Sequence, residues 1–481
     1  MFMKHIITLN LIVLLLLGCY QKKHTTEPVA FLGGEIINPK TNFVIVDIPN
    51  EQTTDTIYLD EKNRFYYDKK YLHSNVLLFR HGDEYQTIIL EPKDSLMLRL
   101  NTLDFDESLV FAGRGSKKNN YLLKVFLENE ADSKKLMTHS QKNPKDFFDF
   151  IENRRLKQID KFSLYAEKND FSERTINLIT SNINYNNYAD LEVYPFAHYG
   201  EKSLVDSQYL PDYFYKFRST INYNDRDLSH FYAYNRFLST HIDNLAISKF
   251  YEEKNTRQHF DRYDLDYNIT KLHLINELFD DKEIKNRIFR IKTRDYISLI
   301  ESKSDIEKFI MQYKSICKNK NDIEYIENLK TALINLKPGN QLPNFEVIDI
   351  ENNEHKFADV LKKPTLIYFW SLNHKKHFIK SHFKVKELKK EIPELEFISV
   401  NINDKNTDKW KKTTSKYHFN LDREFKLKHP HKTLKDLAIS YLNKVFIVDS
   451  NQNIITSNIN IYDQNINESV KKLLNIGVVT Q

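Results

Sequence analysis

FWSLNHKKH, residues 369–377, is the most informative segment of this chain for its fold. It follows the apolar run TLIY, residues 365–368, whose β-branched and aromatic side chains favour a buried strand. From His374 onward, apolar residues recur at helical spacing among many lysines. The stretch is therefore predicted to join a strand to a basic helix, with two histidines three positions apart at the start of that helix.

This junction resembles that of thioredoxin-like proteins, in which Phe-Trp and a few residues precede Cys-x-x-Cys. Trp370 matches the tryptophan of that pattern, whereas His374 and His377 occupy the two cysteine positions. The resemblance implies a C-terminal α/β thioredoxin-like fold over residues 336–481. It also implies a cis-proline before a later strand, and the matching position in this sequence is Asn443.

The chemistry usual for such a fold requires sulfur that this sequence lacks. Disulfide exchange uses two thiols at a helix N-terminus and a peroxidase uses one, because the helix dipole lowers the thiolate pKa there. An imidazole ring forms neither a disulfide nor a sulfenic acid. The chain has two cysteines, Cys19 and Cys317, and Cys317 lies on the apolar stripe of a predicted helix. We therefore expect no catalytic residue and no cofactor, and interpret the redox site as degenerate.

Two other roles for the histidines remain open alternatives. His374 and His377 share a helix face and form a candidate zinc or copper site with His382, or with His429 and His431. The adjacent lysines repel a cation, so no metal is predicted. The basic segment 374–390 is a candidate contact for an acidic partner or for lipid headgroups, and its alternative is a solvated helix face.

The N-terminus has the pattern of a targeting segment. A short basic start precedes the apolar run 6–17, which is shorter than the roughly 20 residues that span a bilayer. The run ends in LLGC, residues 16–19, which resembles a bacterial lipobox. This resemblance implies a signal peptide over residues 1–18, acylation of Cys19 and a tether over 19–30. Because Tyr20 and not Asp follows the cysteine, we expect anchoring to the outer membrane, facing the periplasm.

Two further regions lie between the tether and the C-terminal domain. Residues 31–118 contain short strand-like runs separated by turns, which predict a β-sandwich. The exit from this region, GRGS at 113–116 and NNY at 119–121, resembles that of the N-terminal β-domain in Bacteroidetes thioredoxin-like lipoproteins of the TlpA and redoxin type. Residues 119–335 carry helical apolar spacing and few breakers, which predict an α-helical domain.

The stretch NINYNNY, residues 182–188, illustrates the many asparagines and tyrosines of the helical region. We interpret these residues as surface and core positions of amphipathic helices. A groove for a carbohydrate or peptide is the alternative.

Composition excludes some partners and leaves two functions in competition. The net charge of +5 is small for 481 residues, which argues against nucleic acid. The expected partners are the membrane, through the lipid on Cys19, and an envelope protein or peptide. The leading hypothesis is a non-redox binding or scaffold protein of the cell envelope. The alternative is an envelope thiol-disulfide oxidoreductase or a peroxidase relative.

Overall fold

The computed structural model describes residues 30–48, 51, 53–69, 76–82, 84–199, 210–254, 261–403, 407–419, 423–463 and 465–474. Cys19, the predicted signal peptide and nearly all of the predicted tether lie outside these residues. Within them, every helix is too short or too polar to cross a bilayer.

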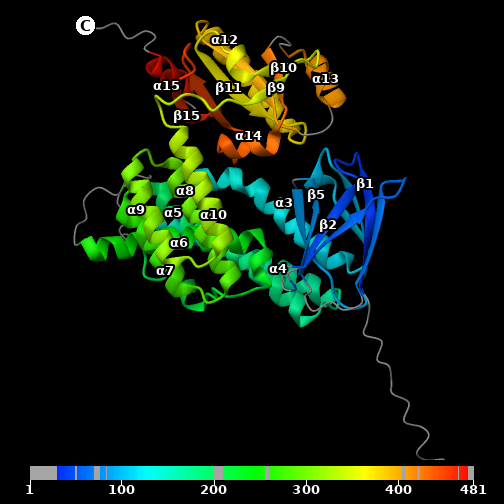
Figure 1. Ribbon diagram of the computed structural model, residues 1–481. Coiled ribbons are helices and arrows are strands. Elements are labelled where there is room, and N and C mark those ends of the chain that lie inside the picture. The colour runs from blue at the N-terminus through cyan, green and yellow to red at the C-terminus, as the bar shows by residue number, and fades with distance from the viewer. Residues whose placement is uncertain are drawn as a thin grey trace, which may run out of the picture.

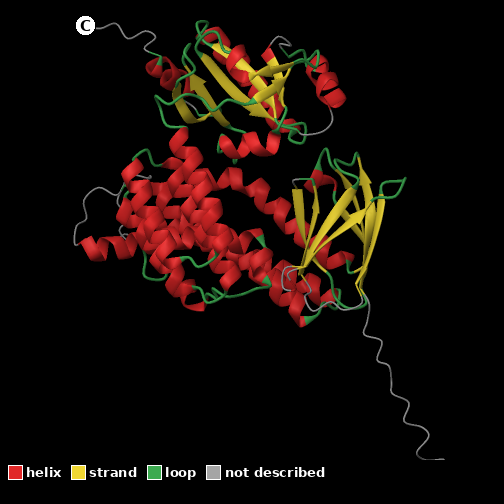
Figure 2. Ribbon diagram, in the orientation of Figure 1, coloured by secondary structure: helices red, strands yellow, loops and turns green. Residues whose placement is uncertain are grey.

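The N-terminal region consists of two packed four-stranded sheets (Figures 1 and 2). The strand order is β4-β1-β7-β8 in one sheet and β3-β2-β5-β6 in the other. Apolar residues from both sheets, such as Leu32 and Phe79, form one shared core because inward and outward residues alternate along the strands. The elements are β1 (Ala30–Ile37), β2 (Phe43–Ile48), β3 (Thr53–Tyr58), β4 (Arg64–Lys69), β5 (Val76–His81), β6 (Glu84–Ile89), β7 (Ser95–Asn101), α2 (Phe105–Ser108) and β8 (Val110–Arg114).

The last strand of this region, β8, needs a glycine near its end, and two asparagines then fix the start of α3. Gly113 has a φ of 83°, and a Cβ there would lie 2.2 Å from the Ser95 carbonyl oxygen. The Asn119 side chain accepts from the Ile89 N–H at 2.8 Å, and that of Asn120 accepts from the Phe111 N–H at 2.9 Å. These bonds tie the first turn of α3 to the sheet edges.

The middle region is helical, and its helices pack around a large apolar core (Figure 2). The elements are α3 (Ser116–His139), α4 (Pro144–Lys168), α5 (Glu173–Tyr199), η3 (Lys216–Thr220), η4 (Leu228–His230), α6 (Tyr232–Lys254), α7 (Leu265–Leu278), α8 (Lys282–Leu299), α9 (Lys303–Ile316) and α10 (Lys320–Asn335). Asparagine, aspartate and serine side chains cap the starts of α4 and of α7 to α10.

The C-terminal region is a seven-stranded mixed sheet in the order β10-β9-β13-β12-β11-β14-β15. Strand β11 pairs in parallel with β12 and antiparallel with β14, and β12 pairs in parallel with β13. The elements are β9 (Glu346–Ile348), β10 (Glu354–Lys356), α11 (Phe357–Val360), β11 (Thr365–Trp370), α12 (Lys375–Glu391), β12 (Glu396–Asn401), α13 (Thr407–Lys416), β13 (Glu424–Leu427), α14 (Pro430–Asp436), β14 (Lys444–Val448), β15 (Ile454–Asn460) and α15 (Ile466–Leu473).

Both faces of this sheet are buried, which explains why β11 is apolar without alternation. Leu366 and Tyr368 pack on one face with α12 and α15. Ile367 and Phe369 point to the other face, whose core is continuous with that of the helical region. Accordingly, α14 lies between the sheet and α10 in Figure 1. The C-terminal domain is thus joined to the helices through apolar packing.

The predicted fold class is confirmed: an N-terminal β-sheet domain, a helical middle and a C-terminal α/β domain of thioredoxin-like topology. The exact domain boundaries stay predictions.

Candidate functional site

The corner between β11 and α12 is the place where a thioredoxin-like fold would carry its thiols. The Asn-containing loop after β11 ends at His374, which is the N-cap residue of α12. The His374 N–H donates to the Ser371 carbonyl at 3.2 Å, and its own carbonyl accepts the first helical bond from Phe378 at 3.0 Å. His377 follows in the first turn. The structure therefore places both histidines where the sequence predicted.

A buried aromatic cluster supports this corner from below. Trp370 is completely buried and packs with Phe378 of α12 and Trp410 of α13. The Trp370 and Phe378 ring centroids lie 5.3 Å apart. The tryptophan at the end of β11 is therefore a core residue that anchors the start of α12.

A buried carboxylate lies beneath the same corner, at a position that no sequence pattern marks. Glu424, the first residue of β13, is 2% exposed. Its Oε1 lies 2.9 Å from His382 Nε2, and its Oε2 accepts from the Trp370 indole N–H at 3.3 Å. The His382 ring also stacks on Phe419 at 3.5 Å between centroids. His382, considered above as a metal ligand, is thus bound to a carboxylate.

Both ring nitrogens of His382 have partners. Its Nδ1 lies 2.7 Å from the Phe378 carbonyl oxygen, one helical turn earlier. Its Nε2 lies near both Glu424 and Ser399 Oγ, the latter at 3.3 Å. The polar atoms of this buried side chain are therefore satisfied, as burial requires.

His377 is held as a neutral ring. Burial, together with the nearby His374 and His382, lowers the pKa of His377 to about 4. The Tyr462 hydroxyl donates to the His377 carbonyl at 3.1 Å. The backbone of Leu442, next to Asn443, lies against the His377 ring. The loop before β14 and the start of α12 therefore meet.

The loop at Asn443 has its own supporting contacts. The Asn443 carbonyl accepts from the Ile461 N–H at 2.8 Å, and all peptide bonds between described residues are trans. The adjacent Lys444 is 9% exposed, and burial lowers its pKa to about 8. Its Nζ donates to the carbonyls of Leu437 and Ala438, so it caps the C-terminal end of α14.

The same corner contacts the N-terminal β-region. Lys376 of α12 forms an ion pair with Glu107 of α2 at 3.3 Å. Lys40 lies 2.5 Å from Glu84 and reaches the Asn373 carbonyl at 3.4 Å. The side chain of Lys40 is only 8% exposed. One part of the basic segment 374–390 therefore faces carboxylates of another domain.

The remaining candidate residues lie apart from this corner. Cys317 follows α9 and is 1% exposed in the core of the helical region. His429 caps α14 and lies 3.3 Å from Glu346. Within the described part of the chain, no three His, Cys, Asp or Glu side chains are placed to hold a metal ion.

Comparison with known proteins identifies the C-terminal domain. Residues 338–457 match the model of the AhpC/TSA family. This match covers the central sheet and the β11–α12 corner, so the chain contains a thioredoxin-like redoxin domain. No curated protein matches the chain.

Several solved structures resemble a little under a third of the chain. The thioredoxin domain of a thiol-disulfide oxidoreductase from Bacteroides vulgatus is 19% identical, with a TM-score of 0.23, over 29% of this chain and 99% of that one. A thiol:disulfide interchange protein from Bacteroides sp. is 18% identical, with a TM-score of 0.23, over 29% and 91% of the two chains. A domain of a possible thiol-disulfide isomerase from Cytophaga hutchinsonii is 20% identical, with a TM-score of 0.25, over 29% and 95%.

Proposed function

We propose that this chain is a lipid-anchored protein of the periplasm whose thioredoxin-like domain has a non-redox binding or scaffold role. The observation that carries the proposal is the absence of sulfur at the β11–α12 corner. His374 and His377 stand at the start of α12, and the one cysteine of the described residues, Cys317, is buried in the helical core.

The contacts of the corner support a structural use of it. A redox site must stay open to its substrate, whereas Lys376 and the Asn373 carbonyl are engaged with Glu107 and Lys40 of the β-region. Beneath them the His382–Glu424 pair is buried and fully bonded. The start of α12 thus serves to position one domain against another.

A thiol-disulfide oxidoreductase or peroxidase of the cell envelope is the second candidate. The match of residues 338–457 to the AhpC/TSA family favours it. In this chain such an activity would have to use Cys317, or a thiol brought by a partner.

The two functions are separated by assaying the purified full chain for insulin reduction and peroxide consumption. We expect no turnover. We also expect Cys317 to react with a chromogenic disulfide only after denaturation, since its thiol is buried in the folded chain. Turnover that is lost in Cys317→Ser would establish the second candidate. Turnover that survives this substitution would contradict both the non-redox role and a redox role of Cys317.

The lipid anchor is tested separately. We expect incorporation of an alkyne-labelled fatty acid into the wild-type chain, none into Cys19→Ala, and recovery of the labelled protein with outer membranes. Protection from external protease in intact cells, lost in permeabilised ones, is expected for a protein that faces the periplasm. Unchanged labelling of Cys19→Ala would contradict the assignment of Cys19.

A further inference from the structure

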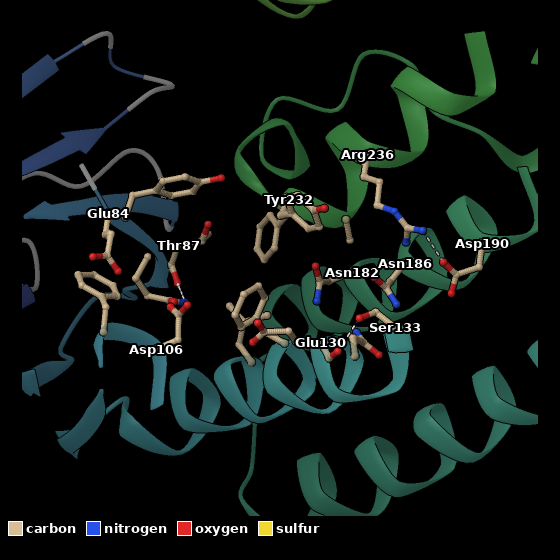
Figure 3. A pocket seen from close by; sticks show the side chains of 18 of the residues that line it. Glu84, Thr87, Asp106, Glu130, Ser133, Asn182, Asn186, Asp190, Tyr232 and Arg236 are labelled. Atoms are coloured by element: carbon tan, nitrogen blue, oxygen red, sulfur yellow. Dashed lines mark hydrogen bonds and ion pairs between the residues drawn. The ribbon is translucent and has the colours of Figure 1, made fainter. Parts of the chain in front are cut away.

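A cavity of about 590 Å³ lies between the N-terminal β-region and the helical region (Figure 3). This volume is in the range of pockets that hold small ligands. Its walls come from β6, α2, one face of α3, Arg154 of α4, the middle of α5 and the start of α6. It lies outside the thioredoxin-like domain and has no part in the function proposed above.

The cavity is lined by two amide side chains of largely buried residues, Asn182 and Asn186. Asn182 is 9% exposed and Asn186 is 7% exposed. Both point into the cavity in Figure 3, one helical turn apart on α5. Neither side chain makes a hydrogen bond to any residue that the structure describes. Because an amide carries both donors and an acceptor, these two groups suit a ligand that also has both.

One end of the cavity is acidic. Asp106 and Glu84 lie together at this end, and Glu130 lies nearer the middle (Figure 3). Lys40 neutralises Glu84, but neither Asp106 nor Glu130 forms an ion pair with a described residue. Burial and the carboxylates of Glu84, Glu107 and Glu130 raise the pKa of Asp106 to about 6. A cationic group placed here would relieve this repulsion.

The opposite end has an excess of positive charge. Arg236 and Arg154 share the single carboxylate of Asp190, with Arg236 at 2.6 Å. The side chains of all three are at least three-quarters buried. One terminal nitrogen of Arg236 donates to Asp190, and the other N–H groups of Arg236 bond to none of the described residues. A carboxylate is the group that such a guanidinium binds most readily, through two parallel bonds.

We propose that this cavity binds a short peptide with free termini, its ammonium group at Asp106 and its carboxylate at Arg236. The amides of Asn182 and Asn186 then bond the peptide backbone, and the partly exposed rings of Tyr85 and Tyr232 line the same cavity. A neutral saccharide would satisfy the amides as well. It would leave the charges at both ends of the cavity uncompensated. A peptide is favoured because its ammonium and carboxylate groups match the acidic end and the basic end.

The test uses the purified full chain and a randomised tripeptide mixture in three forms: free, N-acetylated and C-amidated. Retained peptides are measured by affinity selection and mass spectrometry, and the affinity of the best one by calorimetry. We expect saturable binding of free tripeptides, weakened at least tenfold by either modification. No retention at millimolar concentration, equal retention of the modified forms, or tighter binding of chitotriose than of any tripeptide would overturn the proposal.

Variants assign the two ends. Asp106→Asn should lower affinity for the free tripeptide about tenfold while leaving that for its N-acetylated form unchanged. Arg236→Gln should lower affinity for the free tripeptide about tenfold while leaving that for its C-amidated form unchanged. Asp160→Asn, at an exposed position of α4, is the matched control. Because the modified peptides probe each end on the wild-type chain, the proposal stays testable if a variant fails to fold. Equal effects of either variant on all forms would contradict it.

Discussion

His382 Nε2 lies 2.9 Å from Glu424 Oε1, in a buried contact between α12 and β13. The same carboxylate accepts from the Trp370 indole at 3.3 Å. Glu424 therefore fixes two side chains of the strand–helix corner at once, and α12 depends on a residue 42 positions beyond His382 in the chain.

We expect Glu424→Leu to destabilise the C-terminal domain by about 3–5 kcal/mol, because it leaves His382 and the indole N–H buried without a partner. His382→Leu combined with Glu424→Leu should cost less than the sum of the single changes, since no charge is then left unpaired. Denaturant unfolding followed by tryptophan fluorescence measures this, because both tryptophans of the chain lie in this domain. Glu387→Leu, on the exposed face of α12, is the control. Strict additivity of the two changes would refute the coupling.

His374→Cys with His377→Cys should restore a disulfide at the start of α12. Cα atoms three positions apart on a helix lie within the range that a disulfide bridges. The helix N-terminus should lower the pKa of one thiol below the usual value of about 8.5. Thiolate absorbance against pH measures this.

Lys386→Cys with Lys389→Cys has the same spacing on α12, beyond the first turn and near its C-terminal end, and is the control. An equally low pKa in both pairs would show that the start of the helix has no special effect.

His377 predicts a specific acid sensitivity. Its folded-state pKa of about 4 is below the unfolded value of 6.5. Between these two pH values the imidazole is therefore protonated in the unfolded chain and neutral in the folded chain. The stability contributed by the neutral ring is complete above pH 6.5 and is lost as pH falls toward 4. We expect His377→Gln to remove on the order of 2 kcal/mol of this pH dependence, allowing for partial exposure.

Unfolding midpoints at pH 7 and at pH 4.5 measure the difference between wild type and variant. His431→Gln, at an exposed position of α14, should behave as wild type. A variant that loses stability in parallel with wild type would disprove the assignment to His377.

Lys40→Met should loosen the contact between the β-region and the thioredoxin-like domain. It removes the ion pair with Glu84 and the bond to the Asn373 carbonyl, and leaves Glu84 uncompensated beside Asp106. We expect a loss of about 1–3 kcal/mol and faster hydrogen exchange in residues 372–376. Lys62→Met, at an exposed turn, is the control. Unchanged exchange at the corner would show that Lys40 does not hold the two domains together.

The extent of what could be predicted differs between the fold and the site. The strand–helix junction at residues 365–377 was predictable, because an apolar run and helical spacing are properties of neighbouring residues. The sequence motif at residues 119–121 was recognisable, but the hydrogen bonds by which Asn119 and Asn120 tether α3 were not predictable. Their partners, Ile89 and Phe111, lie on strands that meet α3 only in the folded chain. Glu424 gave no signal, because a single glutamate at the start of a strand has the pattern of a surface residue.

The order of strands and helices, and the histidines in place of thiols at the β11–α12 corner, could be predicted from the amino-acid sequence. Both are local: the first depends on side-chain periodicity and the second on which residue occupies each position. Three other features required the folded structure: the contact of Glu424 with His382, the pairing of Lys376 with Glu107, and the position of Asn182 and Asn186 in a cavity that Asp106 also lines. These pairings depend on how distant segments pack, because the burial that makes a charge or an amide significant is created only when those segments meet.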